Sequence, residues 1–153
     1  MPASKTLKRA VKSKTVGKKL KAASDRASKK PVQSKADFAS VFSALKAVMA
    51  EYADQLHVAT DEPQRYYLVT KSQSWKGGPM YFGAVIWGKA YVSYHLMPLY
   101  VCPELVKEIS PELKRRMQGK SCFNFRDLDE ALFAELGNLT KSGVAHYRGK
   151  KFL

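Results

Sequence analysis

Hydrophobic residues recur along this chain with two different periods, one typical of helices and one typical of strands. Two segments, residues 38–56 and 128–139, carry apolar residues at the three- and four-residue spacing of an amphipathic helix. Each segment has a capping-box pair at its start: Ser34 with Asp37, and Asp127 with Glu130. We therefore expect one amphipathic helix after residue 37 and a second one that ends near Gly143, after which the final basic residues fray.

Between these helices the pattern changes to the two-residue period of strands. Strand-like runs cover residues 56–60, 65–70, 80–87, 90–97 and 121–125. Gly88 and Lys89 fit a two-residue type II′ hairpin loop, which pairs Trp87 with Ala90. This register turns Tyr81 toward a core covered by the helices and places Phe82 beside His95 on the opposite, mixed face.

Proline and glycine positions predict two short helices between the strands. The first covers residues 103–108. For the second, residues 111–118, Ser110 supplies the N-cap, Pro111 the first position and Gly119 the end. The fold class predicted is α+β: an antiparallel sheet of about four to five strands packed against an N-terminal and a C-terminal amphipathic helix, with short helices between.

Charge divides the chain into two parts. Of the formal net charge of +14, residues 1–35 carry +11, with twelve Lys or Arg and one acid, whereas residues 36–153 carry only +3. The first part also has no aromatic residue, so it offers too little apolar surface to offset the entropy of ordering. We expect a disordered basic tail over residues 1–35 and a single folded domain over residues 36–153.

The tail suits contact with nucleic acid or another polyanion, because each lysine that neutralises a phosphate releases a counterion. The candidate nucleic-acid-binding residues are Lys8, Arg9, Lys12, Lys14, Lys18, Lys19 and Lys21. A second interpretation stays open, in which the tail is a solvated extension that only aids solubility.

Cysteine spacing and hydropathy bear on the location of the protein. Cys102 and Cys122 form no CxxC motif, and a domain of this size folds without disulfides, so we expect reduced thiols. No apolar run approaches the roughly 20 residues that cross a bilayer, and the N-terminus lacks the apolar segment of a secretion signal. These features favour a cytoplasmic protein without a membrane partner.

Two stretches carry a family resemblance. Residues 91–100 read Tyr-Val-Ser-Tyr-His-Leu-Met-Pro-Leu-Tyr, and residues 110–125 read Ser-Pro-Glu-Leu-Lys-Arg-Arg-Met-Gln-Gly-Lys-Ser-Cys-Phe-Asn-Phe. They resemble the YdhG-like domain of unknown function, a family of small bacterial α+β proteins, over roughly residues 37–142. The resemblance implies an antiparallel sheet flanked by helices. One branch of the family is described as a frataxin-like iron chaperone, so iron is a cofactor implied by analogy alone.

Local spacing predicts neither catalytic residues nor a metal site. The three histidines lie far apart in the sequence, and neither cysteine has a histidine or cysteine at the distance of a ligand motif. The sequence Gly-Lys-Ser at residues 119–121 lacks the earlier glycine that a phosphate-binding P-loop requires. Acidic residues of the first helix are too few for the carboxylate ridge that suits a hard cation.

The mixed face of the predicted hairpin is the candidate ligand site. Aromatic rings with a few polar groups are typical of the lining of a small-molecule pocket. The candidate ligand-binding residues are Phe82, Tyr91, Ser93, His95 and Lys120. Four further cations, together with Lys120, form either a second anion-binding patch or an exposed helix face: Lys114, Arg115, Arg116 and Arg126. For His95 itself, a half-buried structural role is the alternative.

These observations favour a non-enzymatic binding protein. Its domain would hold a small ligand, a metal or a protein partner, and its tail would contact nucleic acid. Two alternatives remain open: a frataxin-like intracellular iron chaperone, and an enzyme of unknown reaction. The second alternative requires His95, Tyr91 and Lys120 to converge in one cleft.

Overall fold

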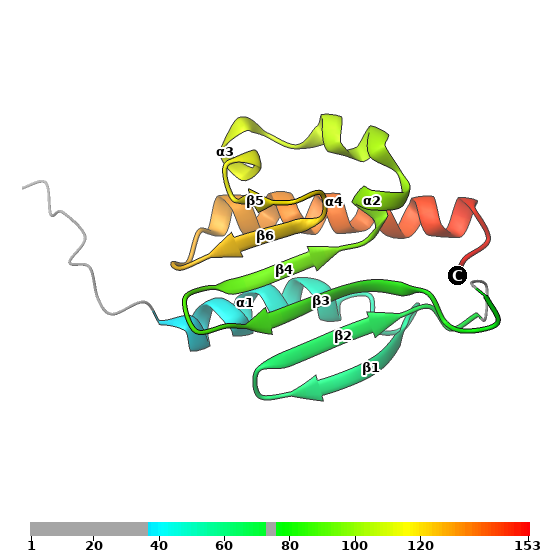
Figure 1. Ribbon diagram of the computed structural model, residues 1–153, viewed down its shortest axis with the longest axis horizontal. Helices are drawn as coiled ribbons and strands as arrows, with labels where there is room; N and C mark the ends of the chain where they lie inside the picture. Colours follow the sequence, from blue (N-terminus) through cyan, green and yellow to red (C-terminus); the bar gives the residue numbers. More distant parts are fainter. Residues whose placement is uncertain (1–36, 73–75) are drawn as a thin grey trace, which may run out of the picture. The chain divides into compact units, whose positions relative to one another are not determined.

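The computed structural model describes residues 37–72 and 76–153, which fold into a sheet layer and a helix layer (Figure 1). The sheet has six antiparallel strands in the order β1-β2-β3-β4-β6-β5. The strands are β1 (His57–Glu62), β2 (Arg65–Val69), β3 (Tyr81–Trp87), β4 (Val92–Leu96), β5 (Met117–Gln118) and β6 (Cys122–Phe125). The basic tail predicted for residues 1–35 lies outside the described residues. The predicted α+β class is confirmed, with more strands than expected.

Two long helices, α1 (Phe38–Ala50) and α4 (Glu130–Gly149), cover one face of the sheet and pack against each other. Three short helices connect β4 to β5: α2 (Pro98–Val101), the 3₁₀ helix η1 (Pro103–Glu108) and α3 (Pro111–Lys114). None of the helices in the described ranges is both long and apolar enough to cross a bilayer.

The core lies between the sheet and the two long helices. Both amphipathic stripes are largely buried. In the sheet, β2, β4 and β6 bury every second residue, whereas β3 buries Phe82, Gly83, Ala84 and Val85 in succession. The buried residues of the helices include Val41, Phe42, Leu45 and Met49 of α1, and Leu132, Phe133, Leu136 and Leu139 of α4. Aromatic side chains meet edge to face across the layers, with the Phe125 and Phe133 centroids 5.1 Å apart.

The N-caps of the two long helices are Asp37 and Asp129, not Ser34 and Asp127 as the predicted capping boxes required. Asp37 accepts a hydrogen bond from the backbone N–H of Ser40, and Asp129 accepts one from that of Leu132. Leu128, which the predicted stripe included, precedes the helix and is exposed.

Helix α4 continues past the predicted end at Gly143. This glycine lies at a contact between helices, because a Cβ atom placed there would lie 2.9 Å from Pro98 of α2. The glycine therefore allows α2 to approach α4 closely instead of ending the helix. The final residues, predicted to fray, pack on the domain instead: the Phe152 ring contacts Tyr147 at a centroid distance of 5.4 Å.

The hairpin of β3 and β4 has a different register from the predicted one. Trp87 pairs with Val92 instead of Ala90. The loop therefore has four residues, and it is closed by a 2.9 Å hydrogen bond from the Gly88 N–H to the Tyr91 carbonyl. The predicted two-residue loop is therefore wrong: Ala90 and Tyr91, which were expected in the second strand, belong to the loop.

A β-bulge in β3 reverses the predicted faces of two aromatic residues. Leu68 of β2 pairs with Gly83, but the next residue, Val69, pairs with Tyr81, so Phe82 is the extra residue. Phe82 is fully buried and its ring meets Tyr147 of α4 edge to face at 5.3 Å. The prediction that Phe82 lies beside His95 is therefore wrong; Tyr81 lies on that face instead.

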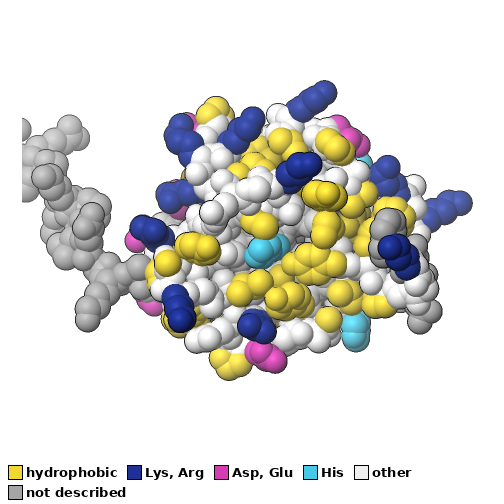
Figure 2. Space-filling view, viewed as in Figure 1, with side chains coloured by type: hydrophobic (Ala, Val, Ile, Leu, Met, Phe, Trp, Pro, Cys, Tyr) yellow, Lys and Arg dark blue, Asp and Glu magenta, His cyan; other side chains and the backbone are white. Residues whose placement is uncertain are grey.

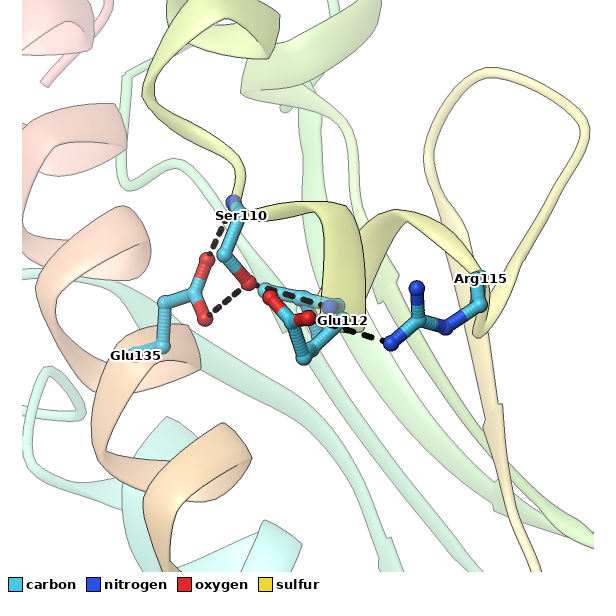
Figure 3. A network of polar contacts seen from close by, with 5 residues as sticks. Ser110, Glu112, Arg115 and Glu135 are labelled. Carbon is cyan, nitrogen blue, oxygen red and sulfur yellow. Dashed lines mark hydrogen bonds and ion pairs between the residues drawn. The ribbon is translucent and has the colours of Figure 1, made fainter.

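The segment predicted as one helix over residues 111–118 divides into α3 and β5. The predicted cap is confirmed: Ser110 Oγ accepts from the Leu113 N–H at 3.1 Å. Glu135 of α4 accepts from both the N–H and the hydroxyl of Ser110, at 2.7 and 2.8 Å (Figure 3). These bonds fix α3 on α4, and the chain then turns back so that Met117 and Gln118 pair with β6.

Candidate ligand-binding face

The face of the sheet opposite α1 and α4, here called the open face, carries the candidate site. Figure 2 shows this face, where hydrophobic side chains spread over the strands around a central histidine. By the strand register, the open face presents Tyr67, Tyr81, Ala84, Ile86, Ser93, His95, Cys122 and Asn124. Two rows of these residues run across the strands.

The first row joins a cysteine and a histidine. Cys122 of β6 pairs with His95 of β4, and the distance between Cys122 Sγ and His95 Nδ1 is 2.8 Å. The row continues through the small Ala84 to Tyr67, whose ring centroid lies 6.1 Å from that of Tyr81. A thiol, an imidazole and two phenol rings therefore share one surface.

The second row is a chain of hydrogen bonds between polar side chains. Ser93 Oγ donates to Asn124 Oδ1 at 2.9 Å, and Asn124 Nδ2 donates to Gln118 Oε1 at 2.7 Å. These bonds orient both amides. Within the described residues, no hydrogen bond engages the Gln118 NH₂ group, which is therefore a donor that a ligand can use.

A hollow of about 380 Å³ adjoins the second row and is here called the arginine hollow. Its lining comprises Tyr91, Arg115, Arg116, Met117, Gln118, Asn124 and Arg126, so three arginines and no acidic residue line it. Arg115 is also paired with Glu112 at 3.1 Å (Figure 3). Among the ion pairs of the described residues, none involves Arg116 or Arg126. This surface is suited to an anion.

An apolar hollow of about 590 Å³ lies at the other end of the open face. Tyr81, Met97, Tyr100, Val101 and Phe152 are among the residues that line it. Tyr100 is 59% exposed, a large value for an aromatic side chain. Lys120 lies over the Tyr100 ring, with its Nζ 5.3 Å from the centroid.

The structure brings some of the predicted site residues together and separates others. Ser93 and His95 lie on the open face as expected, and Tyr91 lines the arginine hollow. Lys120 lines a different hollow, beside Tyr100, to which neither His95 nor Tyr91 contributes. The predicted anion patch divides in the same way: Arg115, Arg116 and Arg126 meet in the arginine hollow, while Lys114 and Lys120 line the hollow beside Tyr100.

Residues of the site that sequence reasoning missed come mainly from the strand neighbouring β4. Cys122, Asn124 and Gln118 reach the open face because β6 and β5 pair next to β4. The alternating pattern of residues 121–125 predicted a strand but did not show which strands pair with it. Tyr67 was visible in a predicted strand, but only the register across β3 places it in line with His95.

Burial favours the neutral form of His95. It lowers the pKa of His95 below its ordinary value of 6.5, because the half-buried ring loses hydration that favours the charged form. A neutral imidazole has one nitrogen that donates and one that accepts a hydrogen bond, so the 2.8 Å contact fits a hydrogen bond between Cys122 and His95.

The same shift predicts a pH dependence of stability. The unfolded chain binds a proton at His95 below pH 6.5, whereas the folded chain binds this proton only at a lower pH. Folding free energy from this residue is therefore lost as the pH falls below 6.5, and the loss stops once the folded form is also protonated. Between pH 7 and pH 5, we expect the free energy of unfolding, measured with urea, to change less for the His95→Gln variant than for the parent protein. Parallel curves for the two proteins would contradict the prediction.

The structure also brings metal-binding residue types together at a place where spacing predicted none. Donor atoms of Cys102, Glu104 and His146 all lie within 4.8 Å of one another. Cys102 lies between α2 and η1, Glu104 lies in η1 and His146 lies in α4, so the cluster is not part of the open face. Because His146 is far from the other two residues in the sequence, local spacing could not identify the cluster.

Comparisons with protein-family models, with curated proteins and with solved structures find no match to this chain. The resemblance of residues 37–142 to the YdhG-like domain therefore stays a prediction.

Proposed function

We propose that this protein is a non-enzymatic binding protein that takes single-stranded nucleic acid on the open face of its sheet. The observation that carries the proposal is the arginine hollow, which opens beside a sheet face rich in tyrosine rings. Cations and aromatic rings in this arrangement match the two parts of a nucleotide, the phosphate and the base.

The phosphate contact is assigned to the arginine hollow. Arginine binds phosphate oxygens through two parallel N–H groups, which gives stronger contacts than a neutral hydrogen bond. Arg116 and Arg126 are the main candidates, because Arg115 is partly neutralised by Glu112. A volume of about 380 Å³ lies in the range of small-ligand sites and accommodates a phosphate with part of its nucleoside.

The base contacts are assigned to the tyrosines of the open face. Single-stranded nucleic acid binds to antiparallel sheets by stacking its bases on aromatic rings. Each stacked base contributes about 1–3 kcal/mol of binding free energy. Tyr91 borders the arginine hollow, and Tyr81 and Tyr67 lie on the strands beyond. Between them, the row of Ser93, Asn124 and Gln118 offers side-chain amides for hydrogen bonds to base edges.

The tail would add affinity without selecting a sequence. Residues 1–35 carry a net charge of +11, against +3 for the rest of the chain. We assign to the tail the long-range attraction of a polyanion, and to the open face the short-range contacts with phosphate and base. This division continues the hypothesis of a binding domain with a basic arm.

The alternatives receive less support from the geometry. An enzyme centred on His95, Tyr91 and Lys120 needs one shared cleft, but Lys120 lines a different hollow from Tyr91. Iron chaperoning continues to rest on the family resemblance alone. Membership of the YdhG-like family, which we also propose, implies the fold and leaves the ligand open.

The test is fluorescence anisotropy of a labelled single-stranded oligonucleotide with the full chain at increasing salt. We expect the affinity to fall steeply with salt, and the slope to weaken by about 2 when Lys18, Lys19 and Lys21 are all replaced by Gln. The variant should still bind, because the open face is unchanged. Binding that is insensitive to salt would refute the proposal. Loss of all binding in the tail variant would show that the open face is not a site.

A further inference from the structure

Three side chains with metal-binding atoms converge where η1 meets α4. The donor atoms of Cys102, Glu104 and His146 all lie within 4.8 Å of one another, although 42 positions separate the second residue from the third. No other group of three or more His, Cys, Asp or Glu residues in the described part of the chain is so arranged.

The histidine of this cluster is oriented as metal-binding histidines are. His146 Nδ1 lies 3.2 Å from the carbonyl oxygen of Ser142, one helical turn earlier in α4. An N–H at Nδ1 that donates to this carbonyl leaves the lone pair on Nε2, the atom that faces Glu104 at 3.4 Å. A backbone acceptor on the far nitrogen is a common second contact of metal-binding histidines, where it fixes the tautomer.

The cysteine of the cluster is free and fixed in place. Cys102 joins α2 to η1, followed by Pro103, and only 1% of its surface is exposed. The thiol forms no disulfide, so its sulfur is free to bind a metal.

We infer that Cys102, Glu104 and His146 form a zinc site. Thiolate, imidazole and carboxylate are the ligand types of Zn²⁺, and a set of three protein ligands with a water in the fourth position is a known form. Hard cations such as Mg²⁺ prefer oxygen ligands alone, so the thiol selects against them.

The distances agree with a tetrahedral ion after a small adjustment. Zinc bonds of about 2.0–2.1 Å to nitrogen and oxygen place those two ligands about 3.4 Å apart, as found for Nε2 and Oε1. With a Zn–S bond of about 2.3 Å, the sulfur lies about 3.5 Å from each of the others. The Glu104–His146 separation already fits, so the adjustment concerns the Cys102 sulfur, which lies within 4.8 Å of the other donor atoms and needs to approach them by about 1 Å at most.

An ion pair between Glu104 and His146 is the simpler use of two of these residues. It requires a protonated histidine and gives no role to the cysteine. The two explanations therefore differ at Cys102, and a spectroscopic signal that depends on the thiolate separates them. Zinc would also link the connection between β4 and β5 to α4, so binding should raise the melting temperature of the protein.

The experiment is a titration of the metal-free full chain with Co²⁺, followed by displacement with Zn²⁺. We expect one ion per chain at micromolar concentrations, with the thiolate-to-cobalt charge-transfer band and the intense visible bands of tetrahedral cobalt. Cys102→Ser should abolish the charge-transfer band. His146→Gln and Glu104→Gln, at partly exposed positions that leave the fold intact, should weaken zinc binding by at least about tenfold.

Cys122→Ser is the matched control, because it removes the other cysteine, which contacts His95. This variant should keep the band and the affinity. Failure to bind either ion would overturn the inference, as would a band that disappears in Cys122→Ser and persists in Cys102→Ser. Unchanged zinc affinity in both His146→Gln and Glu104→Gln would also overturn it, even if Cys102→Ser does not fold.

Discussion

Replacing Phe82 by alanine is expected to lower the free energy of unfolding by about 3–5 kcal/mol. Phe82 has no exposed surface and packs edge to face on Tyr147, so its removal leaves a cavity between β3 and α4. The substitution also removes an aromatic pair that contributes beyond the buried area. Urea unfolding followed by circular dichroism measures the loss, provided that the slope of the transition is unchanged.

Tyr81→Ala is the matched control, because it truncates the neighbouring aromatic residue in the same strand. The bulge turns Tyr81 to the open face, where it is only partly buried, and we expect a cost of about 1–2 kcal/mol. A regular strand would reverse this order, since Tyr81 would then lie in the core and Phe82 outside it. A larger cost for Tyr81→Ala than for Phe82→Ala would therefore contradict the bulge.

Elements defined by local patterns were the most predictable part of this fold. The apolar stripe of α1 and the cap at Ser110 depend on residues within one or two helical turns, so spacing alone identified them. The bulge at Phe82 is different, because it depends on the pairing of Leu68 and Val69 and on a ring supplied by α4. No window of a few residues contains that information.

The candidate site was predictable only where it lies within one strand. Ser93 and His95 follow from the alternation of β4, but the partners that give them chemistry come from β6. A connection of more than twenty residues with three short helices separates β4 from β6, and its path is set by packing on α4. For the same reason, the arginine hollow could not be foreseen.

One wrong boundary had a larger consequence than the others. Reading Gly143 as a helix end left His146 outside the predicted helix, so the residue had no fixed position from which to bind a metal. In the structure Gly143 is needed for contact with Pro98, and the helix continues and carries His146 toward Glu104. A glycine inside a helical pattern can therefore mark a close packing site as well as an end.

Removing two arginines from the arginine hollow is expected to weaken binding of single-stranded nucleic acid by about 100-fold at low salt. A hydrogen bond to a charged group contributes about 1.5–3 kcal/mol, so Arg116→Ala and Arg126→Ala should each lower the affinity at least about tenfold. The dependence of log affinity on log salt should also weaken by about 1.4, because two phosphates are no longer neutralised. Anisotropy titrations of the double variant at several salt concentrations measure both quantities.

The control for this variant is Lys141→Ala with Arg148→Ala, which removes the same charge from α4 on the other face of the sheet. Long-range attraction depends on net charge and should fall equally in both double variants, whereas direct phosphate contacts are lost in the first alone. A loss of affinity confined to Arg116 and Arg126 thus places the nucleic acid on the open face. Equal losses would mean that only the charge of the protein matters, and the role assigned to the arginine hollow would have to be abandoned.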